Sequence, residues 1–310
     1  MELGITPWSI SDTNDARALC EQAKFAEKLG FSYFFLPEHH FVRGRAIPDP
    51  LLLLAAVAAT TSSIRLATTS YLLPLRHPVL AAEQVAVLDR LSNGRLTLGV
   101  GRGASDALFT TFEVPAKQKR SLFEDCYHRM IGAWHGDSVA PSTSESSVTI
   151  SPLPLQEPHP PIWVAAFGPL ALSQAGRLGL PYLASPRESL SRLAQNYQIH
   201  REASKKAGVT SPLEIPIMRS VLVSEDEELI RDVRARVAQD IAINRTADSA
   251  LSDPSVDDWA LIGNPSKVRD LLSEYREKLN MTHLVATRLG IRGISSTDCQ
   301  ESLTLLADIA

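Results

Sequence analysis

The chain has 310 residues, of which 44% are hydrophobic and 21% are charged, and its formal net charge is −4 at pH 7. This is an ordinary globular composition, and the absence of a block of Lys and Arg argues against a nucleic-acid-binding surface. The longest apolar run, 51–59, is too short to cross a bilayer and argues against a membrane protein.

Short β-like runs alternate with longer helix-like runs along the chain. Asp49 is the expected N-cap of a helix that begins with Pro50, and Gly30 and Asn93-Gly94 are expected to end helices. In its first third the chain predicts a strand at 3–6, a helix at 15–29, a strand at 33–36, a helix at 50–60, a strand at 64–71, a helix at 78–91 and a strand at 96–100.

The remaining two thirds continue the alternation, with two interruptions. The segment 136–160 is rich in Ser, Thr and Pro and predicts a loop, with a hairpin at 148–150 as one interpretation. The segment 244–265 predicts a long connection before a helix that begins near Ser266. The other elements predicted are a helix at 120–135, a strand at 161–166, a helix at 169–178, a strand at 181–184, a helix at 190–207, a strand at 215–223, a helix at 225–243, a strand at 282–287 and a helix at 297–309.

Eight β-then-α units in this order favour a parallel α/β sheet, and eight such units close into a (β/α)8 TIM barrel. We therefore expect one barrel domain over residues 1–310, with loop insertions near 136–160 and 244–265. The alternative is an open, doubly wound sheet. That fold normally has a Gly-rich fingerprint after its first strand, and no such fingerprint follows residue 6.

The cysteine pattern gives information about compartment and metals. Three cysteines lie far apart, at Cys20, Cys126 and Cys299, which indicates reduced thiols in a cytoplasmic protein. Residues 1–4 show no basic segment typical of a secretory signal. Because adjacent side chains on an extended chain point to opposite sides, His39 and His40 are not expected to share one ion, and no metal site is predicted.

Chemistry-bearing residues follow several of the predicted strands. In a barrel the carboxyl ends of the strands form the active-site face, so we expect these residues to converge at one mouth. The residues are Glu38, His39 and His40 after the second strand, Thr69, Ser70 and Tyr71 at the third, Gly101, Arg102 and Gly103 after the fourth, Phe167 and Gly168 after the fifth, and Ser185 after the sixth.

Each of these groups has a functional and a structural interpretation. Histidine titrates near neutrality and can transfer protons, but a histidine pair at a strand end is also often a hydrogen-bonded corner. Arg102 can bind an anion with its planar fork, or it can pair with a carboxylate such as Asp106. The glycines around it can form a tight turn. No G-x-S-x-G motif is present, which argues against nucleophilic hydrolysis.

Three motifs resemble those of the bacterial luciferase-like flavin monooxygenases, which are (β/α)8 barrels. They are LPEHHF at 36–41, LPLRHPV at 73–79 and AAEQVAVLDRLSNGRLTLGVGRG at 81–103. The resemblance runs nearly end to end. Two departures stand out, because Gly101 replaces a reactive cysteine of the luciferase catalytic subunit and Phe167-Gly168 replaces a Glu-Ser pair. The long loop after 215–223 is poorly matched, so the substrate and any light emission are not implied.

The resemblance assigns roles to residues of this chain. It implies that His39, with His40 beside it, transfers protons next to the flavin, and that Thr69-Ser70 forms a cis peptide against the flavin ring. The resemblance implies that Thr69, Ser70, Arg102, Arg120 and Gly168 bind the cofactor. Ser185 is added to this set because it follows a predicted strand end. Arg102 and Arg120 are assigned to the flavin phosphate, as are backbone N–H groups near Gly168.

The resemblance implies a cytoplasmic, two-component FMN-dependent monooxygenase. A separate flavin reductase would supply reduced FMN, which would activate O2 as a C4a-peroxyflavin and oxygenate a small organic substrate. Two alternatives remain open. One is an oxidoreductase that uses the deazaflavin F420 for hydride transfer, and the other is a non-catalytic flavin-binding protein or partner subunit. The presence of both His39 and Arg102 argues against the second.

The helices at 50–60 and 78–91 are apolar almost all round. An outer helix of a barrel needs only one buried stripe, so the surplus apolar face predicts a partner. We expect a homodimer, and the resemblance places the family dimer contact on these same helices.

Overall fold

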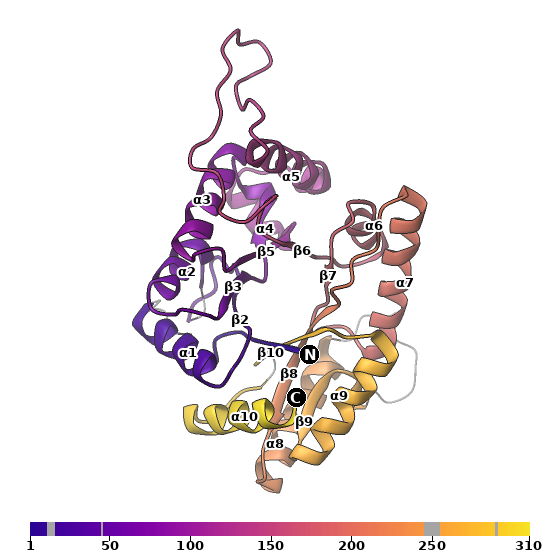
Figure 1. Ribbon diagram of the computed structural model, residues 1–310. Helices are drawn as coiled ribbons and strands as arrows, with labels where there is room; N and C mark the ends of the chain where they lie inside the picture. Colours follow the sequence, from indigo (N-terminus) through magenta and orange to yellow (C-terminus); the bar gives the residue numbers. More distant parts are fainter. Residues whose placement is uncertain (11–15, 45, 245–254, 289–290) are drawn as a thin grey trace. The chain divides into compact units, whose positions relative to one another are not determined.

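The computed structural model describes residues 1–10, 16–44, 46–244, 255–288 and 291–310. The chain packs as two compact units (Figure 1). Unit 1 consists of residues 1–9, 25–34 and 167–310, and unit 2 consists of residues 10–24 and 35–166. Helix α1 (Ala16–Lys28) and strand β2 (Tyr33–Leu36) run from one unit into the other. The prediction of one domain over residues 1–310 stays a prediction.

Unit 2 is built on parallel strands whose side chains are almost all buried. Leu66 of β3 pairs with Leu96 of β5, and Leu98 of β5 pairs with Ile162 of β6. All six residues of β5 are buried, as expected for a parallel strand covered on both faces. Besides the end of β2, the elements are β3 (Arg65–Thr68), β4 (Tyr71–Leu72), β5 (Leu96–Gly101), β6 (Ile162–Ala165), η1 (Leu73–Leu75), η2 (Ala116–Gln118), α2 (Pro50–Ala58), α3 (Pro78–Leu91), α4 (Asp106–Thr111) and α5 (Lys119–Trp134).

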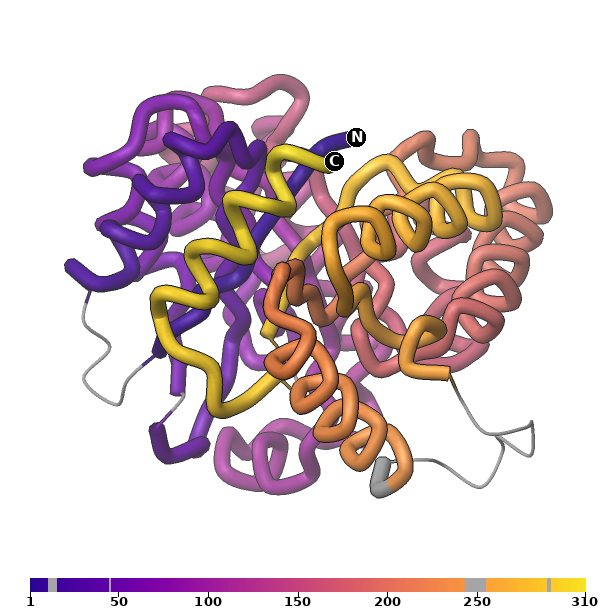
Figure 2. Tube along the Cα trace, turned by 90° about the horizontal axis from the view of Figure 1, so that it is seen from below, coloured from indigo at the N-terminus to yellow at the C-terminus, as the bar shows by residue number. Residues whose placement is uncertain are grey.

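Unit 1 holds the remaining strands, in the order β2–β1–β10–β8–β9. Ala184, directly after β7, bridges Ile217 of β8 in parallel. The start of β1 and the end of α10 lie close together in this unit (Figures 1 and 2). The elements are β1 (Glu2–Ile5), β7 (Tyr182–Leu183), β8 (Pro216–Val223), β9 (Ala260–Gly263), β10 (His283–Thr287), η3 (Val256–Asp258), α6 (Pro169–Arg177), α7 (Leu190–Ala207), α8 (Glu227–Asn244), α9 (Pro265–Leu279) and α10 (Ser296–Ile309).

The strands pair in parallel wherever β1, β2, β3, β5, β6, β8, β9 and β10 meet within a unit, which confirms the predicted α/β class. Asp49 caps α2 as predicted, because its side chain accepts a hydrogen bond from the Leu52 N–H at 3.1 Å. Within the described ranges, no helix is both long enough and apolar enough to pass through a membrane.

Four local predictions need correction. The strand predicted at 64–71 is two strands, β3 and β4, separated by Thr69 and Ser70. The helix α4 lies in a stretch for which no element was predicted. The connection predicted at 244–265 contains η3 and β9, and β9 pairs with β8 in a register that local sequence cannot specify. No strand occurs at 148–150, although the Val139 N–H donates to the Val148 carbonyl at 2.7 Å. Residue 15 of the helix predicted at 15–29 and residues 245–254 of the connection predicted at 244–265 lie outside the described residues.

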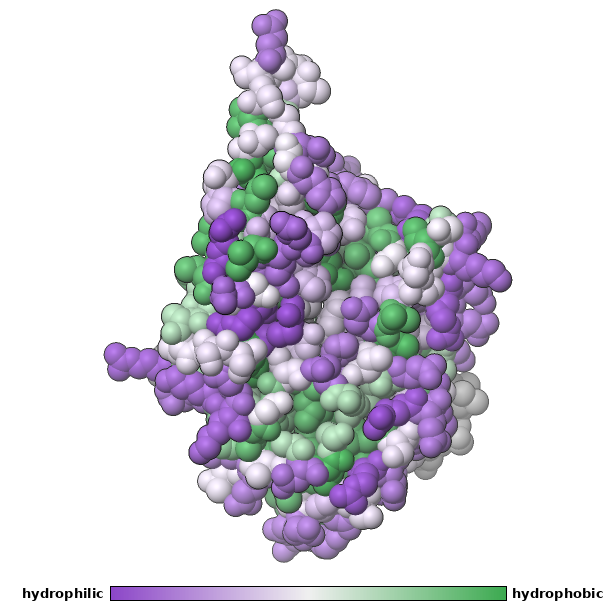
Figure 3. Space-filling view, in the orientation of Figure 1, coloured by the Kyte–Doolittle hydropathy of each residue, from purple (hydrophilic) through white to green (hydrophobic). Residues whose placement is uncertain are grey.

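The outer helices of unit 2 keep an exposed apolar face. On α3 the residues Leu80, Val87 and Leu91 are 53%, 43% and 60% exposed, and their spacing places them on one side of the helix. Leu52 of the adjoining α2 is 71% exposed. In Figure 3 hydrophobic residues, drawn green, reach the surface along the side of unit 2 where Figure 1 places α2 and α3. The surplus apolar face expected from the sequence is therefore present.

Candidate active site

Glu38 lies two residues after the end of β2 and has a fully buried side chain. Its Oε1 accepts a hydrogen bond from Arg76 Nη2 at 2.8 Å and lies 2.7 Å from His40 Nε2. Its Oε2 accepts from the Leu72 N–H at 3.0 Å. Burial raises the pKa of Glu38, and the Arg76 charge and the two other donors oppose that rise without cancelling it. The carboxyl group thus ties the loop after β2 to β4 and η1.

The two adjacent histidines have different surroundings. The backbone of His39 exchanges two hydrogen bonds of 2.9 Å with Ile47, and its side chain is exposed. The His40 side chain is only 7% exposed, and its ring packs edge-on against Phe112 with centroids 4.9 Å apart. The different exposure of the two rings agrees with the expectation that adjacent side chains point to opposite sides. The proton-transfer roles of both residues stay predictions.

Thr69 and Ser70 connect β3 to β4, and the peptide bond between them is cis, as the family resemblance implies. The Thr69 N–H donates to the Leu36 carbonyl at 2.8 Å, which holds this segment beside the end of β2. Thr69 Oγ1 is buried without a hydrogen-bond partner among the described residues. A buried hydroxyl of this kind is a group that a ligand can satisfy.

Ser70 determines which residue can stand at position 101. Strand β4 pairs with the end of β5, with Leu72 opposite Gly101. A β-carbon added to Gly101 would overlap Ser70 Oγ and would lie 3.0 Å from Ser70 Cβ. The glycine that departs from the luciferase pattern is therefore favoured by the serine, because a β-carbon at position 101 would force the Ser70 side chain to move.

Arg102 follows β5 and is 7% exposed. Its Nη1 donates to the Ala165 carbonyl at 3.3 Å, and its guanidinium carbon lies 4.6 Å from the centroid of the Phe123 ring. Burial lowers the pKa of Arg102 to about 10; the charge of Arg120 acts in the same direction, and Glu124 acts against it. The charge of Arg120 thus acts on the buried guanidinium of Arg102, which lies at the carboxyl end of β5.

This cationic pair fits a phosphate monoester. Arg120 is exposed in the first turn of α5, where helix N–H groups add to the attraction for an anion. A bound dianion between Arg102 and Arg120 would offset both the burial of one guanidinium and the repulsion between the two. The donor set therefore suits the phosphate of FMN, and by the same chemistry it suits other phosphorylated cofactors.

The two remaining predicted site residues belong to unit 1. Gly168 is exposed as the N-cap of α6 and has a φ of 76°, a conformation that favours glycine. Ser185 follows β7, and its Oγ accepts from the Arg187 N–H at 3.2 Å. Its carbonyl accepts from Nη1 of the fully buried Arg219 at 3.0 Å. The loop after β7 is therefore anchored through its backbone. His39, His40, Thr69, Ser70, Arg102 and Arg120 lie in unit 2.

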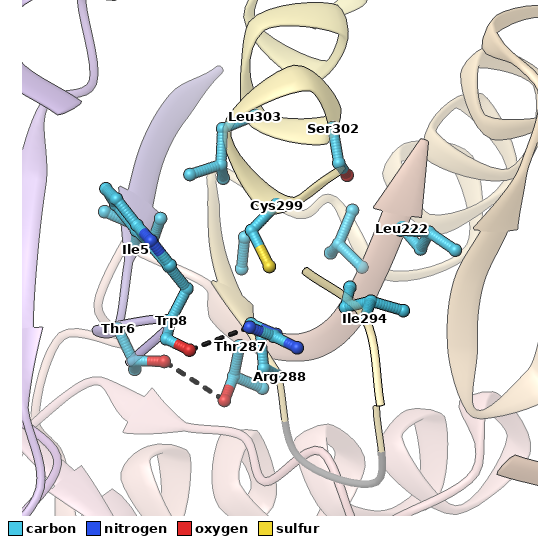
Figure 4. A pocket seen from close by; sticks show the side chains of 12 residues that line it. Ile5, Thr6, Trp8, Leu222, Thr287, Arg288, Ile294, Cys299, Ser302 and Leu303 are labelled. Carbon is cyan, nitrogen blue, oxygen red and sulfur yellow. Dashed lines mark hydrogen bonds between the residues drawn. The ribbon is translucent and has the colours of Figure 1, made fainter. Parts of the chain in front are cut away.

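A separate recess in unit 1 lies beneath α10 (Figure 4). Arg288 lines it and donates from Nη1 to the Trp8 carbonyl at 2.8 Å, while Thr6 Oγ1 donates to Thr287 Oγ1 at 3.2 Å. Cys299 points into it, and burial raises the pKa of this thiol, which makes it a poor nucleophile. None of the predicted site residues lines this recess. Across the described ranges, no cluster of His, Cys, Asp and Glu is arranged to hold a metal.

Sequence reasoning did not assign Arg76 or the contact between Ser70 and Gly101. Arg76 lies inside the motif 73–79, so its position in that motif was the available signal. Its pairing with Glu38 spans 38 residues of chain and is visible only in the folded structure.

A family model described as luciferase-like monooxygenase matches residues 3–281. The chain belongs to the luciferase-like monooxygenase family. The family predicted from the three sequence motifs is therefore confirmed.

The curated relatives of this luciferase-like chain include named monooxygenases. The oxygenase component of a flavin-dependent trigonelline monooxygenase from Acinetobacter baylyi is 30% identical over 220 residues, which cover 68% of this chain and 60% of the relative. Limonene 1,2-monooxygenase of Rhodococcus erythropolis is 26% identical over 298 residues, with 88% and 76% covered. The protein y4vJ of Sinorhizobium fredii is 34% identical over 172 residues, with 54% and 49% covered. The chain thus spans about half to three fifths of the length of y4vJ and the trigonelline enzyme.

Solved structures with the same fold come from several enzymes. The monooxygenase RslO1 from Streptomyces bottropensis has a TM-score of 0.83 and 27% identity, covering 100% of this chain and 98% of the other. The oxygenating constituent of 3,6-diketocamphane monooxygenase from Pseudomonas putida, in complex with FMN, has a TM-score of 0.82 and 19% identity, covering 100% and 97%. The F420-dependent tetrahydromethanopterin reductase from Methanopyrus kandleri has a TM-score of 0.74 and 19% identity, covering 100% and 98%. The luciferase-like (β/α)8 fold class is confirmed.

Proposed function

We propose that this chain is the oxygenase component of a two-component, FMN-dependent monooxygenase. The observation that carries the proposal is the pair Arg102 and Arg120. Arg102 is buried after β5, Arg120 is exposed in the first turn of α5, and the Arg120 charge helps to lower the pKa of Arg102. The trigonelline relative supports the proposal, because its name gives both the flavin dependence and the oxygenase role. The FMN complex of the diketocamphane enzyme shows that the fold accommodates FMN.

The residues of unit 2 have separable tasks in this proposal. Arg102 and Arg120 bind the phosphate, and Thr69 and Ser70 form a wall of the cofactor site, with the Thr69 hydroxyl available to the ligand. His39 is the main proton-transfer group. His40 assists it from a buried position. When bound, reduced FMN supplies the two electrons with which O2 is activated for transfer of one oxygen atom to a small organic substrate.

Two residues of unit 1 keep the cofactor-binding roles predicted from the sequence. Gly168 has backbone N–H groups at the start of α6 that suit an anion, and Ser185 lies in the anchored loop after β7. The proposed partners are O2, a separate flavin reductase and the organic substrate. A second copy of the chain is proposed to cover Leu52, Leu80, Val87 and Leu91. A cytoplasmic location is proposed from the three free cysteines, which are all buried.

An F420-dependent hydride-transfer enzyme is the second candidate, because the Methanopyrus kandleri reductase has the same fold. Arginines that bind a phosphate serve either cofactor, so Arg102 and Arg120 do not distinguish them. A non-catalytic flavin-binding chain is the third candidate. The buried contact between His40 Nε2 and Glu38 Oε1 favours a catalytic chain over it.

Anaerobic titration of the protein with reduced FMN and with reduced F420 separates the first two candidates. We expect reduced FMN to bind more tightly. Admission of O2 to the reduced FMN complex, with trigonelline and limonene among the compounds offered, then tests oxygen transfer by product mass and by hydrogen peroxide released. Tighter binding of reduced F420 would overturn the proposal. If the protein binds reduced FMN but leaves the rate of its oxidation by O2 unchanged, the chain is a non-catalytic flavin-binding protein.

A further inference from the structure

The buried carboxyl group of Glu38 is shared by three donors from two parts of unit 2. Arg76 Nη2 and His40 Nε2 both lie within 2.8 Å of Oε1, and the Leu72 N–H meets Oε2 at 3.0 Å. The Glu38 side chain is 0% exposed, and those of His40 and Arg76 are 7% and 19% exposed. A carboxylate satisfied in this way accepts at both oxygens and has no proton to give.

The contacts of Glu38 decide where the proton between Glu38 and His40 resides. Arg76 is always charged, and its Nη2 lies 2.8 Å from the same Oε1 that faces His40. A proton on that oxygen would compete directly with the guanidinium, whereas a proton on His40 Nε2 completes a charge-assisted hydrogen bond. The arrangement therefore favours Nε2–H donating to an ionised Glu38.

The His40 ring also packs against two aromatic side chains. Phe112 packs edge-on at 4.9 Å, and Phe41 lies with its centroid 5.7 Å away. Nδ1 has no hydrogen-bond partner among the described residues. With Nε2 committed to Glu38, Nδ1 is the one ring atom at which a neutral His40 can take up a proton.

We propose that Glu38, braced by Arg76, is a positioning residue that holds His40 with its proton on Nε2 and presents Nδ1 as the proton-accepting atom of the ring. Because Glu38 also holds Leu72, two residues beyond Ser70, the same carboxylate keeps the His40 loop and the Thr69-Ser70 wall in one arrangement. The use of Nδ1 in oxygen transfer rests on the proposed function. The position of the proton between Glu38 and His40 rests only on the contacts of Glu38 and is independent of that function.

Proton NMR on protein labelled with ¹⁵N in its histidines tests the placement without any turnover. We expect a downfield proton that exchanges slowly with water and shows one-bond coupling to a histidine Nε2. The signal is assigned to His40 by its disappearance in His40→Gln. A downfield proton without coupling to nitrogen would place it on the carboxyl group, and the lack of any such signal would mean that the ring is not held. Either result overturns the proposal for the wild-type protein, so the test does not depend on a variant that folds.

The variant Glu38→Met removes the acceptor and tests the positioning role. We expect the downfield Nε2–H signal to be lost. The yield of oxygenated product per reduced FMN oxidised should fall about tenfold or more, up to the 10²–10⁴-fold that a placed proton-transfer group contributes. Because Glu38 acts through His40, the double variant Glu38→Met/His40→Ala should lose no more yield than His40→Ala alone. Multiplicative losses would show that Glu38 is a structural residue only.

Asp89→Asn is the matched control in the same unit. Asp89 is fully buried and accepts hydrogen bonds from the Leu155 and Gln156 N–H groups at 2.7 and 2.8 Å, far along the chain from His40. This variant should lower stability and leave both the Nε2–H signal and the product yield unchanged. The NMR result and the oxygen-transfer result can fail separately. If the Nε2–H signal is present in the wild type and lost in Glu38→Met, but the wild-type protein transfers no oxygen, Glu38 holds His40 as proposed and the proposed function fails. If the wild type transfers oxygen but shows no Nε2–H signal, only the proposed role of Glu38 is overturned.

Discussion

Ser70 Oγ occupies the space that a β-carbon on Gly101 would need. The two residues lie on neighbouring strand ends, because β4 pairs with the last residues of β5. Position 70 and position 101 are therefore not independent, and a side chain at one of them restricts the other. Ser70 belongs to the segment that the proposed function assigns to the flavin, and Gly101 lies beside it.

The variant Gly101→Ala should destabilise the protein by about 1–3 kcal/mol, as overpacking does in a well-filled region. Rotation of the Ser70 hydroxyl accounts for the low end of this range, and the 3.0 Å contact with Ser70 Cβ for the high end. Denaturant unfolding of Gly101→Ala, Ser70→Gly and the double variant checks the prediction. The double variant should regain most of the loss caused by Gly101→Ala. Additive effects would mean that the two residues do not compete for space.

The variant Arg102→Ala should weaken FMN binding much more than riboflavin binding, because riboflavin lacks the phosphate. Loss of one charge-assisted contact costs about 1.5–3 kcal/mol, or roughly tenfold to a hundredfold in affinity. Calorimetric titration with both flavins measures the difference. Arg129→Ala is the control, because Arg129 lies on the same helix as Arg120 with 48% of its side chain exposed. Equal losses for the two flavins would assign Arg102 a structural role.

The variant His39→Ala should reduce oxygen transfer and leave binding of reduced flavin largely intact. A placed proton-transfer group contributes about 10²–10⁴-fold in rate. The measurement is product formed per reduced FMN oxidised, in wild type, His39→Ala and His40→Ala. We expect the larger loss at His39, which is exposed, and a smaller one at His40, which is held by Glu38. Wild-type coupling and rate in His39→Ala would remove His39 from the mechanism.

A charge on the exposed face of α3 should dissociate the expected homodimer. Leu80→Glu and Val87→Glu each place a carboxylate where the surplus apolar face would be covered. Light scattering should report twice the mass of one chain for the wild type and the mass of one chain for these variants. Leu213→Glu is the control, since Leu213 is 86% exposed in unit 1 and should leave the mass unchanged. A wild-type protein with the mass of one chain at micromolar concentration would contradict the dimer.

The loss of folded-state stability at acid pH should depend in part on Asp257. Burial acts to raise the pKa of Asp257, but hydrogen bonds from Lys267 and Arg234 outweigh it and hold this pKa below its ordinary value of 3.8. The ionised carboxylate therefore stabilises the folded state fully above pH 3.8, and this contribution is lost as the pH falls through the folded-state value.

Asp257→Asn should consequently cost roughly 0.5–1 kcal/mol at neutral pH, after allowance for solvent screening, and nothing at the acid end. Thermal unfolding of the wild type and of Asp257→Asn at a series of pH values from neutral to acid checks whether their stabilities become equal at the acid end. Asp232→Asn is the control, because Asp232 is 51% exposed and its ion pair with Arg231 is 3.8 Å long. A constant difference between wild type and Asp257→Asn across this pH range would contradict the assignment.

Local signals were sufficient for most elements of this fold. The bounds of Tyr33–Leu36, Pro78–Leu91 and Leu190–Ala207 agree with the prediction to the residue. Apolar periodicity, proline in a first turn and a capping side chain such as Asp49 act over a few residues, so they can be read from the chain directly. The alternation of strands and helices in turn specified the α/β class, and three motifs specified the family.

Other elements depended on partners far along the chain. Strand β9 is only four residues long, and it is defined by its register with β8 about 40 residues earlier. The segment predicted as one strand at 64–71 divides because β4 pairs with the end of β5, while Thr69 is held by the carbonyl of Leu36. Local residue propensities do not contain the energy of pairing with a distant strand, so they could not predict these boundaries.

For the candidate site, sequence by itself determined which residue types stand at the strand ends, including His39, His40, Arg102 and the glycine at 101. Tertiary structure alone decided how they differ from one another: that His40 is buried against Glu38 while His39 is exposed, and that Arg102 is buried near the charge of Arg120. The physical reason is that residue identity and strand-end position are properties of the local chain. Burial, hydrogen-bond partners and neighbouring charges arise only when segments separated by tens of residues pack together.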